Sequence, residues 1–269
     1  MRIGIKPGQW GWSFDELVAS WRAADEAGFG VISCFDHVSA RPAEAAAWDA
    51  PTLLSAMAGV TTRAGLAVDV VNSVLRHPFL LAGQLAVAQA ASAGRLEVGL
   101  GAGSYHLARH DHDALGIPFP PHAERLDRLE GCCRVLPALW RGQSVTDQAL
   151  GLRDASLGPV GIAPPRLVVG GRSERAMEIA ARYADGWNLH EPEPAAYRRA
   201  LRRMDDVCDR VGRQRRLWRH AQLFVRAIGP YGLRDAALAA SDAGIDSLVF
   251  VLDEERGPEW VRRVADAVL

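Results

Sequence analysis

The chain has 269 residues, enough for one large domain and close to the roughly 250 residues of a typical (β/α)₈ barrel. With 49% hydrophobic and 23% charged residues, its composition is globular, which excludes a disordered or fibrous chain. The net charge is −1 without basic runs, so we expect neither nucleic acid nor a membrane surface as a partner. No apolar stretch reaches about 18 residues and the chain opens directly as a strand, which predicts a soluble cytoplasmic protein.

Two residue counts add to this description. Lys6 is the only lysine among 31 lysine and arginine residues, and alanine, glycine and valine are abundant, which together indicate a GC-rich bacterial genome. The four cysteines show no CxxC spacing, and Cys132 and Cys133 are adjacent. We therefore expect buried thiols and neither a disulfide nor a zinc site.

Apolar runs and amphipathic stretches alternate along the whole chain. Continuous apolar runs predict strands at residues 2–6, 31–35, 66–71, 96–100, 166–169, 184–189, 219–228 and 247–251. Helical periodicity, with proline at starts and glycine at ends, predicts helices at 14–27, 49–62, 78–92, 122–140, 173–183, 194–211, 233–243 and 258–269. The irregular stretch 142–165 is expected to be a loop in which a hairpin can form.

These elements make eight strand–helix pairs without a linker or a second domain. Buried strands that alternate with amphipathic helices indicate a parallel sheet covered on both faces. We therefore predict a single α/β domain over residues 1–269, a TIM barrel. An open doubly wound sheet is the alternative, but it usually has about five to seven strands and a glycine fingerprint after the first.

In a barrel of this kind the functional residues follow the carboxyl ends of the strands. By the predicted boundaries these positions are Gln9, Trp10, Asp36, His37, Asp69, Val70, Asn72, Ser73, Gly101, Ala102, Gly103, Gly170, Gly171, Arg172, Ser173, Asn188, His190, Arg226, Leu252 and Asp253.

The sequence Gly170-Gly171-Arg172-Ser173 ends a strand and opens a helix. Backbone N–H groups at the helix start, together with a guanidinium, would form an anion or phosphate site. A tight turn with an ordinary serine cap explains the same residues equally well. The sequence leaves both interpretations open.

The glycines of residues 99–103 resemble the start of a dinucleotide fingerprint, but Ser104 occupies the position of the third glycine. The motif also follows the fourth strand, which argues against a Rossmann site. The remaining physical use is the close approach of a flat ligand to backbone without side chains.

Asp36 and His37 follow the second strand. A histidine at the barrel mouth can donate or accept a proton near neutral pH, and the adjacent aspartate could fix its orientation. The alternative is a structural Asp–His pair that only holds the loop.

Three histidines and two aspartates crowd residues 106–113: His106, His110, Asp111, His112 and Asp113. Their spacing matches no metal-binding motif, so a solvated polar loop over the mouth is favoured and no metal is expected. The sequence has no GxSxG and no Walker A pattern, which argues against a serine hydrolase and against an NTPase.

Six motifs occur in a fixed order along nearly the whole chain. They are Phe35-Asp36-His37, Arg76-His77-Pro78, the run from Gly94 to Gly103, the run from Leu115 to Pro120 with Glu124-Arg125, Gly170-Gly171, and the run from Ala184 to Asn188. In this combination the chain resembles the luciferase-like flavin- and deazaflavin-dependent oxidoreductases. The Asp-His and Arg-His-Pro forms are similar to the branch that uses coenzyme F420.

The resemblance implies a barrel that binds F420, or alternatively FMN, and transfers a hydride at the cofactor ring. It implies an acid/base role for His37 beside the ring and a non-prolyl cis peptide at Asp69–Val70 against the ring. It also implies that Gly170 and Gly171 hold the cofactor phosphate. The expected cofactor-binding residues are Asp36, Asp69, Val70, Asn72, Ala102, Gly103, Gly170, Gly171, Arg172 and Ser173, and the expected substrate-contacting residues are Trp10, Ser104 and Tyr105.

The sequence departs from this family at one position. Sugar-phosphate dehydrogenases of the F420 branch carry a glutamate where Ser104 stands, and the loops are short, which leaves the substrate undefined. Three functions stay open: an F420-dependent reductase or dehydrogenase, an FMN monooxygenase supplied by a partner reductase, and a non-catalytic flavin-binding barrel. The resemblance also implies a homodimer formed through barrel helices.

Overall fold

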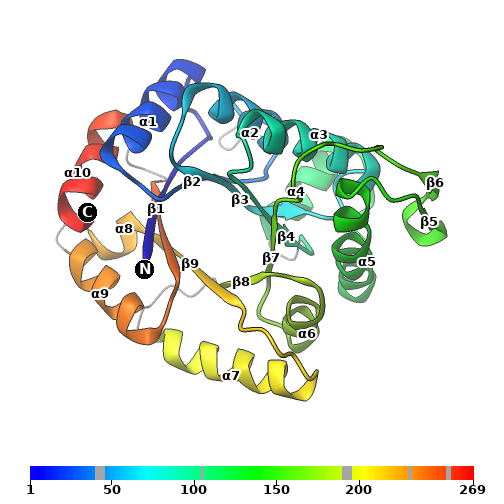
Figure 1. Cartoon of the computed structure of the whole chain (residues 1–269). Helices are drawn as coiled ribbons and strands as arrows, with labels where there is room; N and C mark the ends of the chain where they lie inside the picture. The colour runs from blue at the N-terminus through cyan, green and yellow to red at the C-terminus, as the bar shows by residue number, and fades with distance from the viewer. Residues whose placement is uncertain (40–45, 104–105, 190–195, 230–231, 253–255) are drawn as a thin grey trace.

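The computed structural model describes residues 1–39, 46–103, 106–189, 196–229, 232–252 and 256–269. Within them, eight parallel strands close into a barrel in the order β1-β10-β9-β8-β7-β4-β3-β2 (Figure 1). These are β1 (Arg2–Pro7), β2 (Val31–Cys34), β3 (Gly65–Asn72), β4 (Leu96–Gly101), β7 (Arg166–Gly170), β8 (Gly186–Leu189), β9 (Trp218–Phe224) and β10 (Ser247–Leu252). Because β1 pairs with both β10 and β2, the predicted barrel is confirmed and the open sheet is wrong.

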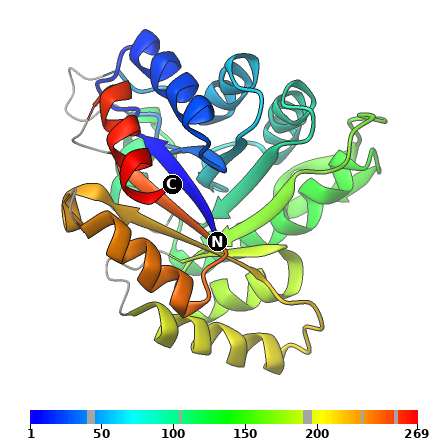
Figure 2. The ribbon, with the colours of Figure 1, turned by 60° about the vertical axis from the view of Figure 1, so that its left-hand side comes forward.

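Helices surround the barrel, and the last helix lies beside the first (Figures 1 and 2). The helices are α1 (Phe14–Ala27), α2 (Ala50–Val60), α3 (Pro78–Ala91), α4 (His106–Leu115), α5 (His122–Trp140), α6 (Glu174–Tyr183), α7 (Tyr197–Arg210), α8 (Val225–Ile228), α9 (Leu233–Ala243) and α10 (Pro258–Val268). None of the described helices is long and apolar enough to cross a membrane.

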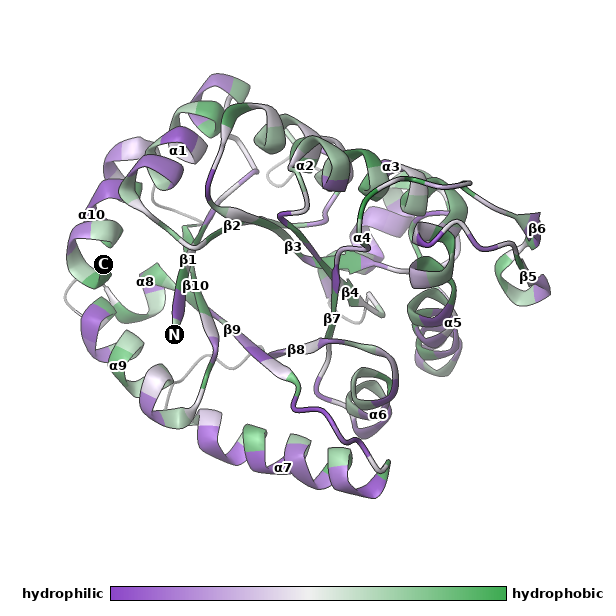
Figure 3. Ribbon diagram, viewed as in Figure 1, coloured by the Kyte–Doolittle hydropathy of each residue, from purple (hydrophilic) through white to green (hydrophobic). Residues whose placement is uncertain are grey.

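Local sequence explains where several helices begin and how they pack. Ser13 and Glu16 form a reciprocal capping box at the start of α1, and Gly28 ends that helix with φ +93°. Along α7 the buried residues recur every third or fourth position, at Tyr197, Leu201, Met204 and Val207. This spacing places one apolar stripe against the barrel while the other sides of α7 are hydrophilic (Figure 3).

The barrel interior alternates between polar and apolar layers along its axis. At the amino ends of the strands, Arg2 makes an ion pair with the buried Glu97, and its Nε donates to Oγ of Ser247 at 3.2 Å. Near the amino ends of the strands, Val31, Ala67 and Val249 form a small buried cluster. Two residues further along β2 and β3, on the same face of each strand, stand Ser33 and Asp69. A second polar layer therefore lies toward the carboxyl ends of the strands.

The structure differs from the predicted elements at one strand boundary and in one loop, and it confirms one expectation. The strand predicted over 219–228 ends at Phe224, and residues 225–228 form the short helix α8. The stretch 142–165 contains the predicted hairpin, made of β5 (Val145–Asp147) and β6 (Leu152–Ala155) around a 3₁₀ turn (Gln148–Leu150). The second difference is α4, which occupies residues predicted to be a loop.

Candidate active site at the carboxyl end of the barrel

The carboxyl ends of the strands bring together most of the residues expected to form the site. Since all eight strands are parallel, the residues that follow them meet at one end of the barrel. Those within the described ranges are Trp10, Asp36, His37, Asn72, Ser73, Ala102, Gly103, Gly170, Gly171, Arg172, Ser173 and Asn188. Ser104 and Tyr105, together with His190 and Asp253, lie outside the described residues.

His37 is held by a residue that the sequence did not single out as its partner. Its Nδ1 lies 2.7 Å from Oδ2 of Asp111, a carboxylate that is almost completely buried. The other oxygen of Asp111 accepts hydrogen bonds from the backbone N–H groups of Val38 and Ser39, at 3.2 and 3.0 Å. The ring of Trp10 packs against the imidazole with centroids 5.1 Å apart. The expectation that Asp36 orients His37 is therefore wrong.

Asp36 instead joins the loop after β2 to the end of β3. Its Oδ2 accepts hydrogen bonds from Nη1 of Arg76 at 2.6 Å and from the backbone N–H of Asn72 at 2.9 Å. Arg76 also donates to Asp49 at 2.7 Å. Burial raises the pKa of the Asp36 carboxyl above its usual value, although Arg76 opposes the shift. The carboxylate thus has a structural role at the barrel mouth.

The histidine-rich segment is helix α4, and the prediction of a solvated polar loop is wrong. Asp111 and His112 are buried within it. Nδ1 of His112 lies 2.8 Å from the carbonyl oxygen of Pro118, and its Nε2 lies 3.2 Å from Nδ2 of Asn72. Since a carbonyl only accepts, Nδ1 carries the proton and Nε2 accepts from the amide of Asn72. Within the described ranges no cluster of metal-binding side chains exists.

A sequence signal for α4 was present. Ala108, Asp111 and His112 are buried at helical spacing, and Gly116 follows the helix with φ +65°. The backbone N–H of Ile117 bonds back to the carbonyl of His112. This glycine-terminated pattern is typical of a helix end, but polar residues on the buried face hid the apolar periodicity.

The glycines of β4 and β7 make room for a protein side chain. The peptide bond between Asp69 and Val70 is cis, in agreement with the resemblance. A Cβ atom on Gly101 would lie 2.5 Å from Cγ2 of Val70, and one on Gly99 would lie 2.8 Å from Cγ1. The space beside Gly99 and Gly101, expected to admit a flat ligand, is therefore occupied by the side chain of Val70.

The next glycines along the mouth also face side chains. A Cβ atom on Gly170 would lie 3.1 Å from Val70, and one on Gly103 would lie 2.5 Å from Oδ1 of Asn72. The same oxygen of Asn72 accepts a hydrogen bond from the backbone N–H of Val74 at 3.0 Å. Gly103 is therefore required for the close approach of the Asn72 amide, which is held from two sides.

A network of buried charged and polar side chains lies inside the barrel around Asp69 of β3. Nζ of Lys6 donates to the carbonyl oxygen of Asp69 at 2.9 Å and to the side chain of Gln222. The Asp69 carboxylate accepts from the hydroxyl of Ser33 at 2.5 Å and lies 3.4 Å from Nε2 of His220. Burial opposes ionisation of Asp69, but His220, Lys6 and Ser33 outweigh it and hold the pKa of the carboxyl well below its usual range.

At the start of α6 the residues expected to bind an anion also make a serine cap. Ser173 Oγ accepts from the backbone N–H of Ala176 at 3.3 Å. Gly171 adopts φ +146°, and a Cβ atom there would lie 2.6 Å from the Cβ of Ala176. An α-helix leaves its first N–H groups without intrahelical partners, and the cap uses only that of Ala176. The serine cap and an anion site are therefore compatible at these residues. The positive φ and the close approach to Ala176 require glycine at position 171.

Several buried polar atoms at this end of the barrel have no hydrogen-bond partner among the described residues. These atoms are Nε1 of Trp10, Oδ1 of Asp36, Oγ of Ser73 and Oδ1 of Asn188. Leaving a buried polar group unsatisfied typically costs about 1–3 kcal/mol. Because the four atoms follow β1, β2 and β3 or belong to β8, a polar ligand in the mouth could supply partners to them.

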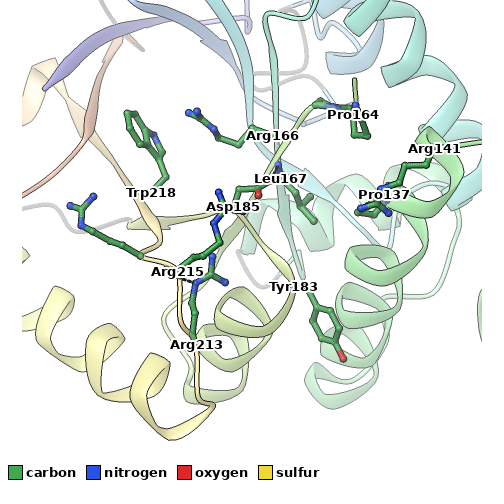
Figure 4. Close-up of a pocket in the computed structure, with 12 residues that line it drawn as sticks. Pro137, Arg141, Pro164, Arg166, Leu167, Tyr183, Asp185, Arg213, Arg215 and Trp218 are labelled. Carbon is green, nitrogen blue, oxygen red and sulfur yellow. Dashed lines mark hydrogen bonds between the residues drawn. The ribbon is translucent and has the colours of Figure 1, made fainter. Parts of the chain in front are cut away.

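A cavity of about 680 Å³ lies at the opposite, amino end of the strands, between α5, α6 and the starts of β7 and β9 (Figure 4). Five arginines line it, but several already serve the fold. Arg213 donates to the carbonyl oxygen of Ala181 in the last turn of α6 at 2.7 Å. Arg216 makes a two-pronged ion pair with Asp246, at 3.0 and 2.9 Å. In barrels of this type the amino end serves stability, so we place the candidate site at the other end.

Comparison with known proteins places the chain in a family. The luciferase-like monooxygenase family model matches residues 2–263. The chain is 29% identical over 193 residues to an F420-dependent glucose-6-phosphate dehydrogenase of Beutenbergia cavernae, covering 70% of this chain and 56% of that protein. It is also 29% identical over 177 residues to an F420-dependent hydroxymycolic acid dehydrogenase of Mycobacterium tuberculosis, covering 64% of this chain and 48% of the relative. The chain thus spans about half the length of these two relatives.

Solved structures share the whole fold. An F420-dependent secondary alcohol dehydrogenase in complex with an F420-acetone adduct superposes with a TM-score of 0.80 at 13% identity, over 99% of this chain and 98% of the other. The F420-dependent tetrahydromethanopterin reductase of Methanopyrus kandleri gives 0.78 at 14% identity, with the same coverage. Together with the family match over nearly the full length, these likenesses settle the identification: the chain belongs to the luciferase-like monooxygenase family.

Proposed function

We propose that this protein is an oxidoreductase that transfers a hydride between coenzyme F420 and a small organic alcohol or carbonyl compound. The observation that carries the proposal is the set of buried polar atoms without partners at the carboxyl end of the barrel, next to the helix start at Gly171. A planar cofactor with polar edges and a phosphate fits this combination. The curated relatives are F420-dependent dehydrogenases by name, which favours F420 as the cofactor.

The residues present suit such a group. The first-turn N–H groups of α6, with Gly170, Gly171, Arg172 and Ser173 beside them, would hold the phosphate. Polar atoms of Asp36, Ser73 and Asn188 would meet the polar edges of the ring. The remaining expected contacts come from Asp69, Val70, Asn72, Ala102 and Gly103. When bound, the deazaflavin supplies a ring carbon that accepts or donates a hydride.

His37 would move the proton that accompanies the hydride. Oxidation of an alcohol removes a hydride from carbon and a proton from the hydroxyl oxygen, and reduction of the carbonyl reverses both transfers. Nδ1 of His37 is engaged with Asp111, so Nε2 is the atom left to exchange a proton with the substrate oxygen. Trp10, whose ring is tilted against the imidazole, would contact the substrate together with Ser104 and Tyr105.

An FMN-dependent monooxygenase that receives reduced flavin from a partner reductase is the second candidate function. The description of the matching family favours it. In either case the chain would act in the cytoplasm as a homodimer. Sedimentation of the purified protein tests the dimer.

Parallel titrations with F420 and FMN test the cofactor. Trp10 lies at the mouth and should report binding through quenching of its fluorescence, whereas Trp12 is buried in the core. We expect F420 to bind with micromolar or tighter affinity and FMN at least about tenfold more weakly. A Trp10→Phe variant should lose most of the quenching but keep the affinity measured by calorimetry. Tight binding of FMN with weak binding of F420 would support the monooxygenase instead.

A further inference from the structure

We propose that Asp111 is a positioning residue that keeps a proton on Nδ1 of His37 and thereby presents Nε2 to the substrate. The inference rests on the proposed function for its catalytic consequence. The arrangement of the imidazole itself does not depend on the cofactor.

Among the described residues, the hydrogen bonds of the Asp111 side chain go to one short segment, residues 37–39. Oδ2 faces Nδ1 of His37 at 2.7 Å, and Oδ1 accepts from the backbone N–H groups of Val38 and Ser39. The Asp111 side chain is 2% exposed and that of His37 is 17% exposed. One buried carboxylate therefore fixes both the ring and the backbone that carries it.

The chemistry of the pair determines where the proton lies. An ionised carboxylate has only acceptor sites, so Nδ1 of His37 must be the donor. This holds for the neutral and the charged imidazole alike. In the neutral ring Nε2 then carries the lone pair, and in the charged ring it carries the proton that can be given up. Nε2 is consequently the atom at which protonation changes.

The surroundings oppose a flip of the ring. Trp10 packs against one side of the imidazole at 5.1 Å, and the ring of Phe35 lies 6.4 Å away. A flip would place a carbon atom opposite Asp111 and leave the buried carboxylate without this partner, which is unfavourable. Asp111 is contributed by α4, 74 positions away along the chain. Asp111 thus acts on the reaction through His37.

Nitrogen NMR of the protein without cofactor tests the tautomer directly. The protein is labelled with ¹⁵N-histidine and studied at about pH 8.5, where an ordinary imidazole is neutral, and His37→Ala assigns the signals. In the wild type we expect His37 to carry the proton on Nδ1. In Asp111→Ala we expect the signals to move toward the Nε2–H form that free imidazoles favour.

Steady-state kinetics supply the second readout. We expect Asp111→Ala to lower kcat by about tenfold or more, with KM within about threefold, because the proton-transferring atom is misplaced while binding contacts remain. Compared with Asp111→Ala, Asp111→Glu should recover part of the Nδ1–H population of His37 and part of kcat. Asp113→Ala is the matched control, since this aspartate is exposed on the same helix, and it should change neither.

The outcomes separate the two proposals. A wild-type His37 with the proton on Nε2, or an Asp111→Ala protein with unchanged tautomer and unchanged kcat, overturns the role of Asp111. If Asp111→Ala does not fold, Asp111→Asn gives the same comparison. The backbone N–H groups of Val38 and Ser39 require the amide oxygen, so the NH₂ group faces Nδ1 and favours the Nε2–H form. A protein that binds no F420 but shows the expected tautomers refutes the proposed function and leaves the positioning role standing.

Discussion

The carboxylate of Asp36 lies 2.6 Å from the guanidinium of Arg76 and does not orient the neighbouring His37. Arg76 is itself shared with Asp49, whose side chain is 38% exposed. Two adjacent residues after β2 therefore have separate partners. Asp36 belongs to a buried ion pair that connects two loops, and His37 belongs to the pair with Asp111.

Replacing Asp36 by Asn should accordingly lower stability. Breaking a buried ion pair by removing one partner is strongly destabilising, and since Asp49 keeps part of the charge of Arg76 compensated, we expect a loss of about 2–4 kcal/mol in the free energy of unfolding. Urea unfolding measures it, and Asp49→Asn should have a smaller effect because Asp49 is more exposed. Unchanged stability with a large loss of kcat would instead show that Asp36 acts in catalysis.

A valine at position 171 should weaken cofactor binding. The positive φ and the 2.6 Å approach of a Cβ atom to Ala176 mean that a β-branched side chain would displace the turn in front of α6. We expect affinity to fall at least about tenfold, equivalent to about 1.4 kcal/mol, with the fold intact by circular dichroism. Gly161→Val is the control, since Gly161 also has positive φ but no atoms near its Cβ position. Equal affinities for the Gly171→Val protein and the wild type would move the phosphate site elsewhere.

His37→Ala should separate catalysis from binding. A positioned acid/base group typically contributes about 10²–10⁴-fold to a rate. We expect kcat to fall by a factor of that order, while cofactor affinity changes only a few-fold. Reduction or reoxidation of bound cofactor with a surrogate substrate provides the measurement. A proportional loss of affinity and rate would make His37 a cofactor ligand, and no change in either would leave it a structural residue.

Lys6 should make stability depend on pH in the alkaline range. Burial lowers the pKa of this lysine to about 8, although Asp69 opposes the shift. Between pH 8 and the ordinary value of 10.5 the unfolded chain binds more protons than the folded one, so stability rises with pH across this window. The full effect is on the order of 3 kcal/mol. Lys6→Met should remove this rise, which unfolding at several pH values can measure. Identical pH slopes for the two proteins would contradict the shift.

Chelators should leave activity unchanged, and the purified protein should contain no stoichiometric metal. Asp111 and His112, the buried members of the histidine-rich helix, already have hydrogen-bond partners in His37, Asn72 and Pro118. A metal would have to displace these contacts. Elemental analysis after purification without added metal provides the test. One equivalent of bound zinc or manganese would contradict this expectation and favour a metal-dependent function.

The sequence by itself determined the architecture. The alternation of apolar strands with amphipathic helices predicted the eight-stranded barrel, and the irregular stretch 142–165 correctly indicated a hairpin. These features depend on residues close together in the chain, whose periodicity and turn preferences act locally. The positions that follow the strands were predictable for the same reason, because parallel strands carry their ends to one side of a closed barrel.

Only the tertiary structure decided which residues touch there. His37 and Asp111 are 74 positions apart in the chain. No local sequence pattern shows that the partner of His37 is Asp111 and not Asp36, the residue directly before it. Val70 explains the glycines of β4 only when β3 and β4 lie side by side. α4 was missed because two of the three buried residues on its inner face, Asp111 and His112, are polar and bind polar groups of the barrel. Only Ala108 contributes buried apolar surface, which hides the apolar periodicity that usually identifies a helix.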